Sequence, residues 1–449
     1  MTEQVFTAAN TDQAARFGPV WLNPGVSRRN ALTYFYAALT TIGMVAFLSF
    51  MQPYLLEENL GIPAAEQGRA TSLLALPYEF AFLLMVGPLG ALADRIGRRP
   101  IYVVGFLWVG AVLVLLPLVE TLLQLGVLRA FYGIGSACIT SMMATVLADY
   151  PQERSRGKML AFSGICNGLG AIVMVLLMGR LLLSTFSEMG YDDLISGRLT
   201  YWCGAGLAVI TALILSRGLK GGSPGKVTER VPIHQLVRKG ARAARGNPRI
   251  LVACCEAFIA RGDLVVVSTF LSLWAKEAGL LSGLSLPEAI GAAAGLAATV
   301  SSAQLLFSPV VGYFIDKVDR LTAMATAMGI AGVAYVWVGF SPDPLAMMFI
   351  PAALLLGMGE AAAILSGAAV IGQEANENIR GAVIGLFNFC GSVGTLIIVF
   401  VGGFLFDAWM PGAPFVMVGI INLLVMCGAI ATRRSTGYRS PDYLASTAE

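Results

Sequence analysis

The chain of 449 residues is strongly apolar: hydrophobic residues make up 57% of it and charged residues only 13%. A soluble chain of this size could not cover so much apolar surface with so few charges, since about a quarter of an ordinary soluble protein is charged. Composition therefore excludes a soluble enzyme, a disordered chain and a disulfide scaffold, and the net charge of +3 is too small to indicate nucleic-acid binding. We expect an all-α polytopic membrane protein.

Apolar runs of about 20 residues, the length that crosses a bilayer as a helix, follow one another along the chain. Twelve are predicted, at 31–53, 71–93, 101–119, 122–148, 158–184, 199–217, 250–276, 287–314, 321–341, 345–371, 380–406 and 413–432. The largest polar interruption follows the sixth run. We therefore expect an N-terminal segment (1–30), a six-helix bundle (31–217), a basic linker (218–249), a second six-helix bundle (250–432) and a C-terminal tail (433–449).

Lys and Arg are unequally divided between the two sides of the predicted membrane. An even number of spans places both termini on one side, and that side holds 24 of the 30 basic residues, against 4 on the other side. Loops rich in Lys and Arg stay in the cytoplasm. We expect a protein of the cytoplasmic (inner) membrane of a prokaryote with both termini in the cytoplasm. Within the basic linker, 232–246 fits an amphipathic helix on the inner leaflet, and a simple charged tether fits the same residues.

The second half of the chain repeats the first. At an offset of 222, the matched residues are Gly90 and Gly312, Asp94 and Asp316, Arg95 and Lys317, and Arg98 and Arg320. At an offset of 224, they include Gly133 and Gly357, Gly135 and Gly359, Cys166 and Cys390, and Gly170 and Gly394. A parallel repeat of this kind builds two bundles that face a site near the middle of the membrane.

The segment Gly90–Arg99, between the second and third predicted spans, resembles motif A of the major facilitator superfamily. The segment Gly312–Arg320 resembles its copy in the second half, and Arg129 with the glycines that follow it resembles motif B. This resemblance covers essentially the whole chain. It implies two pseudo-symmetric six-helix bundles and a secondary transporter that works by alternating access. Leu169 stands where drug antiporters of the superfamily carry a proline, which argues against that subgroup.

In the family that the chain resembles, motif A latches the two halves on the cytoplasmic side. Asp94 ends the second span, where a carboxylate can cap the N-terminus of another helix, the best candidate being the one that begins near 380–381. A basic loop that only sets the topology would also explain the arginines. The candidate latch residues are Gly90, Asp94, Arg95, Gly97, Arg98, Asp316, Lys317 and Arg320.

Ionisable residues inside a membrane are costly, so their default interpretation is functional. Six are predicted inside the spans, namely Glu79, Arg129, Glu256, Arg261, Asp263 and Glu360. All of them except Glu79 fall on spans four, seven and ten. The resemblance implies that these spans line the central cavity. At 1.5 Å per residue, Asp263 and Glu360 lie near the midplane, and Glu256 lies two turns before Asp263 on nearly the same helix face. Because the single histidine, His234, lies in the linker, Asp263, Glu360 and Glu256 are the candidate proton carriers. A snorkelling role remains the alternative for Glu256.

The remaining polar residues of the spans are candidates for the substrate cavity. They are Arg129, Arg261, Tyr34, Tyr36, Thr40, Glu79, Asn167 and Asn388. An arginine could hold an anionic group and a carboxylate could hold a cation, so the charge of the substrate stays open. Glu79 and Arg129 could instead form a structural ion pair, and the rings of span one could simply pack.

These observations predict a secondary active transporter of a small organic solute, coupled to protons through intramembrane carboxylates. A passive facilitator and a membrane receptor or scaffold on the same fold are the alternatives. No catalytic triad, metal-ligand spacing or nucleotide motif is present, so neither an enzyme nor a cofactor is expected. The expected partners are a small-molecule substrate, protons and the lipid bilayer, with no nucleic acid, and we expect a monomer.

Overall fold

The computed structural model describes residues 15–152, 155–222, 233–375 and 379–440, apart from the side chains of 91, 94, 233–237, 380 and 381. The chain begins with a short antiparallel hairpin of β1 (Arg16–Phe17) and β2 (Val20–Trp21). The first bundle contains α1 (Arg28–Tyr54), α2 (Ala64–Ile96), α3 (Arg98–Leu115), α4 (Leu122–Asp149), α5 (Arg156–Met174), α6 (Leu183–Glu188) and α7 (Asp193–Gly218). The linker helix is α8 (Ile233–Gly246).

The second bundle follows the linker helix. It contains α9 (Pro248–Val266), α10 (Ser272–Leu281), α11 (Leu286–Lys317), α12 (Arg320–Gly339), α13 (Ile350–Glu374), α14 (Arg380–Ala408) and α15 (Ala413–Thr436). Wider π turns extend or join some helices, namely η2 (Leu55–Asn59), η5 (Val175–Leu182) and η6 (Val267–Leu271). Two 3-10 turns are η3 (Leu116–Leu118) and η7 (Met347–Phe349). The predicted all-α architecture is confirmed.

Within the described ranges, eleven helices are long and apolar enough to cross a membrane. The remaining predicted span is the seventh, formed by α9, η6 and α10 in one continuous helical run. It is not among these eleven, and its first part carries Arg249, Glu256, Arg261 and Asp263 within 19 residues. This span therefore holds three of the six predicted intramembrane charges.

Glycines of the repeat let equivalent helices pack closely in each bundle. A Cβ on Gly170 of α5 would lie 2.0 Å from the carbonyl oxygen of Leu39 on α1, and a Cβ on Gly394 of α14 would lie 1.7 Å from that of Phe258 on α9. Such short distances mean that only glycine fits there. In each bundle a glycine of the fourth span also packs closely against the second span. Gly133 packs against Tyr78, and Gly357 packs against Val300. The internal repeat is thus a repeat of helix contacts.

Replacing Gly394 by Ala is expected to lower the melting temperature of the purified protein, because the added methyl group meets the Phe258 backbone. Gly372→Ala is the matched control, since a Cβ at Gly372 of α13 meets nothing within 4 Å. Without a clash, Gly→Ala inside a helix stabilises by about 1 kcal/mol. Thermal unfolding in detergent compares the two variants, and an unchanged or higher melting temperature for Gly394→Ala would contradict this packing.

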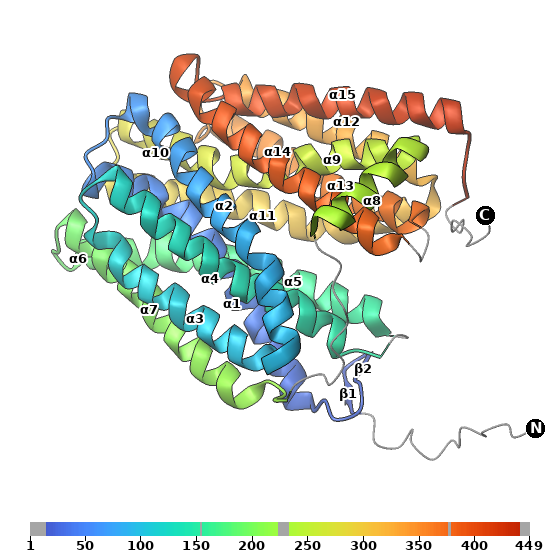
Figure 1. Cartoon of the computed structure of the whole chain (residues 1–449). Coiled ribbons are helices and arrows are strands. Elements are labelled where there is room, and N and C mark those ends of the chain that lie inside the picture. The colour runs from blue at the N-terminus through green and yellow to red at the C-terminus, as the bar shows by residue number, and fades with distance from the viewer. Residues whose placement is uncertain (1–14, 153–154, 223–232, 376–378, 441–449) are drawn as a thin grey trace, which may run out of the picture.

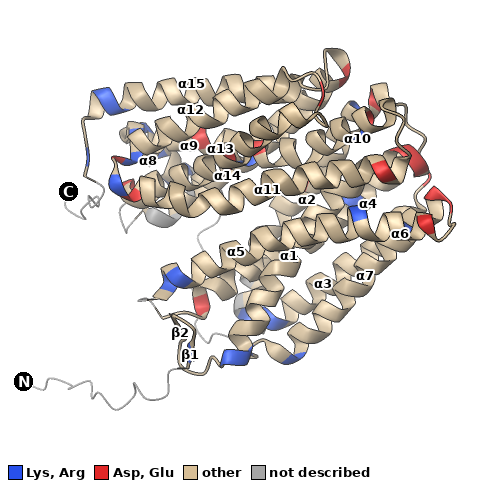
Figure 2. Cartoon of the chain, turned by 180° about the vertical axis from the view of Figure 1, so that it is seen from behind, with Lys and Arg blue, Asp and Glu red and all other residues tan. Residues whose placement is uncertain are grey.

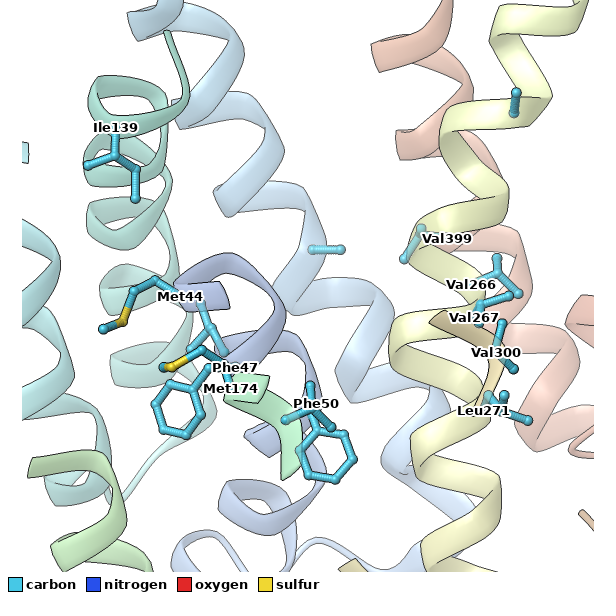
Figure 3. Close-up of a cluster of buried hydrophobic side chains, with 14 of the residues drawn as sticks. Met44, Phe47, Phe50, Ile139, Met174, Val266, Val267, Leu271, Val300 and Val399 are labelled. Atoms are coloured by element: carbon cyan, nitrogen blue, oxygen red, sulfur yellow. The ribbon is translucent and has the colours of Figure 1, made fainter. Parts of the chain in front are cut away.

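The two bundles lie at an angle to each other. Figures 1 and 2 both show them converging at the end where α6 and α10 lie and diverging at the end where the chain termini lie. We call the latter end the terminal face and the former the opposite face. Figure 3 shows buried apolar side chains on both sides of the central region, such as Met44 and Phe47 of α1 and Val266 and Val300 of α9 and α11. Buried apolar side chains of both bundles thus belong to one continuous core.

The linker forms an amphipathic helix that packs on the second bundle. Gly240 of α8 approaches α14 so closely that a Cβ would lie 2.4 Å from the carbonyl oxygen of Ala382. Ala244, one turn later, is buried. The basic side chains on the other side of the helix are exposed, namely Arg238, Lys239, Arg242 and Arg245. The helical interpretation of the linker is therefore confirmed, although its small-residue face contacts protein.

Candidate functional site

A cavity of about 510 Å³ lies between the two bundles. Residues of α1, α2, α4, α5 and η5 form its wall on the first bundle, and residues of α9, η6, α11, α13 and α14 form its wall on the second. Most of the lining is apolar. Four residues predicted for the site lie on this wall, namely Glu79, Arg129, Asn167 and Glu360.

Arg129 is the cation on the first-bundle wall. Its side chain extends from α4 and is 6% exposed, with the guanidinium carbon 5.5 Å from the centre of the Tyr78 ring. Its Nε atom has no hydrogen-bond partner in the structure. The ring stabilises the charge only in part, because a cation over an aromatic face still lacks acceptor atoms. Arg129 thus has unused hydrogen-bonding capacity at the cavity.

Glu79 lies between two arginines. The charges of Arg261 on the second bundle and Arg129 on the first both act on its carboxylate. Neither arginine approaches within ion-pair distance, so the pair suggested for Glu79 and Arg129 does not form in this structure. Glu79 is half-buried and makes its electrostatic contacts across the interface between the bundles.

Arg261 points toward α14 and away from Asp263. Its Nη1 donates to the carbonyl oxygen of Asn388 at 3.3 Å and to the hydroxyl of Ser392 at 3.4 Å. The two-residue spacing predicts this, since Arg261 and Asp263 lie on different sides of one helix. Neither Arg261 nor Asn388 is part of the cavity wall. Both were predicted to lie there, and helix rotation places them against each other instead.

Three carboxylates are buried in the second bundle. Glu256 and Asp263 of α9 are each 1% exposed, and Glu360 of α13 is 2% exposed. Asp263 accepts a hydrogen bond from Nδ2 of Asn422 at 3.1 Å, and Glu360 accepts one from the hydroxyl of Tyr335 at 3.4 Å. Neither oxygen of Glu256 has a hydrogen-bond partner, and it does not snorkel to water.

The partners of these three carboxylates are neutral. Among the described residues, no ion pair includes Glu256, Asp263 or Glu360. An isolated charged carboxylate is far more costly to bury than a neutral acid. Within the same part of the chain, no group of three or more His, Cys, Asp or Glu side chains is arranged to hold a metal ion. The second bundle thus buries three carboxylates that have no cationic partner among the described residues.

The polar side chains of the first span that were predicted for the cavity, Tyr34, Tyr36 and Thr40, do not line it. Tyr34 bonds the hydroxyl of Ser163 at 2.7 Å, Tyr36 bonds that of Thr211 at 3.0 Å, and Thr40 donates to its own helix backbone. They join α1 to α5 and α7 inside the first bundle. The cavity face of α1 is instead formed by Ile42, Val45, Ala46 and Ser49. Those residues follow helical spacing, which identifies a face better than polarity does.

Helix α11 contributes a polar face that was not predicted. Ser301, Gln304 and Ser308 all line the cavity. Their spacings of three and four residues place them on one side of the helix. Ser268 and Thr269 of the π turn η6 add hydroxyls nearby. The signal was present in the sequence as evenly spaced polar residues in an otherwise apolar span.

A set of hydrogen bonds joins the two bundles near the opposite face. Asp407 of α14 accepts from the backbone amides of Gly68 and Arg69 on α2, at 2.9 and 2.7 Å. The fully buried ammonium of Lys276 lies 2.7 Å from both Glu57 and Gln67. We call Glu57, Gln67, Gly68, Lys276 and Asp407 the clamp. It holds the bundles together on the side away from the termini.

The predicted latch residues lie at the terminal face. Arg98 pairs with Asp149 at 3.1 Å inside the first bundle, and Arg320 pairs with Asp316 at 3.0 Å inside the second. Lys317 lies over the Tyr313 ring. Gly90 is buried and Arg95 is exposed. The proposed contact of Asp94 with the start of α14 concerns side chains that lie outside the described ones.

Gly97 separates α2 from α3 in the first copy of the motif. Its φ of +96° favours glycine, and it ends α2 by donating to the Ala93 carbonyl oxygen. Asp319 occupies the matching position of the second copy. It is buried, caps α12 by accepting from the amide of Thr322, and pairs with Arg249 at 3.3 Å. The two copies therefore use different chemistry for the same connection.

Comparison with known proteins identifies the fold and the family. A family model for the Major Facilitator Superfamily matches residues 33–302 and 281–442. The nucleoside transporter NupG, solved as a mutant, superposes with a TM-score of 0.68 at 15% identity, over 90% of this chain and 99% of that chain. At that identity the similarity concerns the fold alone. It confirms the predicted architecture of two six-helix bundles.

Two curated relatives from Paramagnetospirillum magneticum are more similar in sequence. Magnetosome protein MamZ is 29% identical over 397 residues, which are 87% of this chain and 61% of MamZ, so the chain spans about three fifths of that protein. Magnetosome protein MamH is 26% identical over 416 residues, which are 90% of this chain and 92% of MamH. With a family match over both bundles, the chain belongs to the major facilitator superfamily of membrane transporters.

Proposed function

We propose that this transporter moves a small organic solute through the central cavity and couples that movement to protons. The observation that carries the proposal is the set of three buried carboxylates, of which Glu360 lies on the cavity wall. The charge of Asp263 acts on Glu360 and also on Glu256. The set leads from the cavity along α9 toward the terminal face, which is the direction a proton would take.

Alternating access is supported by the arrangement of the bundles. The clamp joins them near the opposite face, while Figure 1 shows them diverging toward the terminal face. We propose that the terminal face is cytoplasmic, because most Lys and Arg lie there (Figure 2). On that assignment the structure is the inward-facing state. A monomer contains the whole cavity, so we propose a monomer as the working unit.

The proposed orientation predicts opposite labelling of two introduced cysteines. Met189→Cys at the end of α6 should react with an impermeant thiol reagent in intact cells, because Met189 is exposed at the opposite face. Lys239→Cys on α8 should react only after the membrane is opened. Both belong in a background without the exposed native cysteines Cys203, Cys255 and Cys427. Labelling of both positions in intact cells would overturn the orientation.

We further propose that the protein serves a magnetosome membrane, because both relatives named above are magnetosome proteins and MamH matches over nearly its whole length. A fluorescent fusion expressed in Paramagnetospirillum magneticum tests this. It should collect where a tagged MamH collects. An even distribution over the cytoplasmic membrane would contradict the assignment to magnetosomes and leave the transport proposal unchanged.

The proposed function is tested with purified protein in lipid vesicles. A pH gradient is imposed, and uptake is measured for a panel of labelled organic anions, cations and zwitterions. Because 1.4 kcal/mol corresponds to a factor of ten, a one-unit gradient can drive about tenfold accumulation per proton. Glu360→Gln should remove the accumulation, whereas Glu120→Gln, a change of an exposed loop carboxylate, should keep it. Equal uptake with and without the gradient would favour a passive facilitator.

A further inference from the structure

Each bundle contributes a buried ionisable group to the cavity wall. Arg129 lies on the first-bundle wall and Glu360 on the second-bundle wall, and each is more than nine-tenths buried. Glu79 lies on the same wall as Arg129 and makes no ion pair with it, and the charge of Arg261 on the second bundle also acts on Glu79. The second-bundle side has the acid without a basic partner. The cavity thus offers a cation from one bundle and an acidic group without a basic partner from the other.

Arg129 and Glu360 each have a polar atom that makes no hydrogen bond within the described protein and could bind a ligand. The Nε of Arg129 is buried without a hydrogen-bond partner. Glu360 accepts one long hydrogen bond through Oε1 from Tyr335, and its Oε2 accepts none from the described residues. Buried polar atoms are nearly always paired, so unpaired ones on a cavity wall indicate an occupant. The occupant should carry an acceptor for Arg129 and a donor for Glu360.

We propose that the cavity binds a zwitterionic solute, with its carboxylate on Arg129 and its ammonium group on Glu360. This inference rests on the proposed transport function and names its substrate class. The rest of the solute should be apolar, since Ile42, Val45 and Phe50 face Val267 and Ile364 across the cavity. Its volume of about 510 Å³ falls within the roughly 300–1,000 Å³ usual for small-molecule sites.

Binding of such a solute would also join the two bundles. The carboxylate would be held by the first bundle and the ammonium group by the second, so a solute with both charges would draw the two walls together. A compound with one charge would leave either Arg129 or Glu360 unpaired, which costs binding energy. At Glu360 an ammonium group and a proton cannot occupy the same carboxylate. Arrival of the solute would therefore release the proton, and its departure would allow the carboxylate to take one up again.

The test measures binding by the full-length protein in detergent, where no gradient exists. The probes are leucine, 4-methylpentanoate, which lacks the ammonium group, and 3-methylbutylamine, which lacks the carboxylate. Isothermal titration should give an affinity for leucine that is at least about tenfold higher than for either analogue, as expected from loss of one charged hydrogen-bonded contact. Equal affinity for all three, or no binding of leucine, would overturn the proposal.

Charge-removing variants assign the two ends. Arg129→Gln should reduce leucine binding to the level of the amine, and Glu360→Gln should reduce it to the level of the carboxylate. Arg129→Lys, which keeps the charge, should restore part of the difference, and Glu120→Gln in an exposed loop away from the cavity should change little. A monodisperse elution profile establishes that each variant is folded. If wild-type vesicles show proton-driven uptake of another solute while leucine does not bind, the substrate class is wrong and the transport proposal stands.

Discussion

Replacing Asp263 by Asn is expected to abolish pH-driven accumulation of the solute while leaving its exchange across the membrane. Asp263 is 1% exposed and its described partner is the amide of Asn422. An asparagine has nearly the same shape and can still accept that hydrogen bond, so the protein should fold. It cannot carry a proton, so net coupled transport stops. Counterflow exchange needs no net proton movement and should continue.

The size of this effect follows from the driving force. A one-unit pH gradient can support about tenfold accumulation per proton, so Asp263→Asn should fall to an internal concentration equal to the external one. Glu120→Gln is the control, because Glu120 lies exposed between α3 and α4 and away from the cavity. The variant Glu256→Gln tests whether the proposed proton path extends along α9 as far as Glu256. Accumulation by Asp263→Asn at the wild-type level would exclude this residue from coupling.

Weakening the clamp is expected to move the protein away from the state seen here. Asp407→Asn replaces a carboxylate acceptor by an amide group, whose nitrogen cannot accept from the backbone of α2. Lys276→Gln removes the buried ammonium that holds Glu57 and Gln67. Hydrogen bonds to charged groups are worth about 1.5–3 kcal/mol each. Loss of one should therefore shift the conformational equilibrium by about tenfold or more.

Spin labels at Met189 and Leu281 report this shift, because both side chains are exposed at the opposite face and lie on different bundles. The wild type should give mainly short distances, and the double variant Asp407→Asn with Lys276→Gln should add a longer population. Asp192→Asn is the matched control. Asp192 also accepts a hydrogen bond from a backbone amide at that face. That amide belongs to α7, the helix that Asp192 itself caps, so the bond does not join the two bundles. Identical distance distributions in wild type and double variant would remove the clamp from the mechanism.

The fold could be predicted from the sequence because its signals are local or repeated. Runs of apolar residues predicted the helices, and the spacing between Gly170 and Gly394 predicted equivalent halves. In the structure both glycines contact the first helix of their own bundle. Burial of Asp263 and Glu360 also followed from sequence, since a carboxylate in the middle of an apolar span has no route to water.

The parts that sequence did not predict depend on helix rotation and on contacts between distant residues. Tyr34 and Tyr36 are polar residues on the correct helix, yet they face α5 and α7. Lys276 and Glu57 are 219 positions apart in the sequence. Each lies at the end of a membrane span, where charged residues are common. Nothing in the sequence pairs them. Only the packing of α10 against α1 and α2 brings their charges together.

The central claim is that movement of the solute is coupled to movement of protons through a cavity with Glu360 on its wall. The most direct measurement imposes a solute gradient on vesicles that start with equal pH on both sides and contain a pH-sensitive dye. The account predicts a pH change inside wild-type vesicles that depends on the solute, and none inside vesicles with Glu360→Gln. Solute entry into wild-type vesicles without any pH change would contradict it.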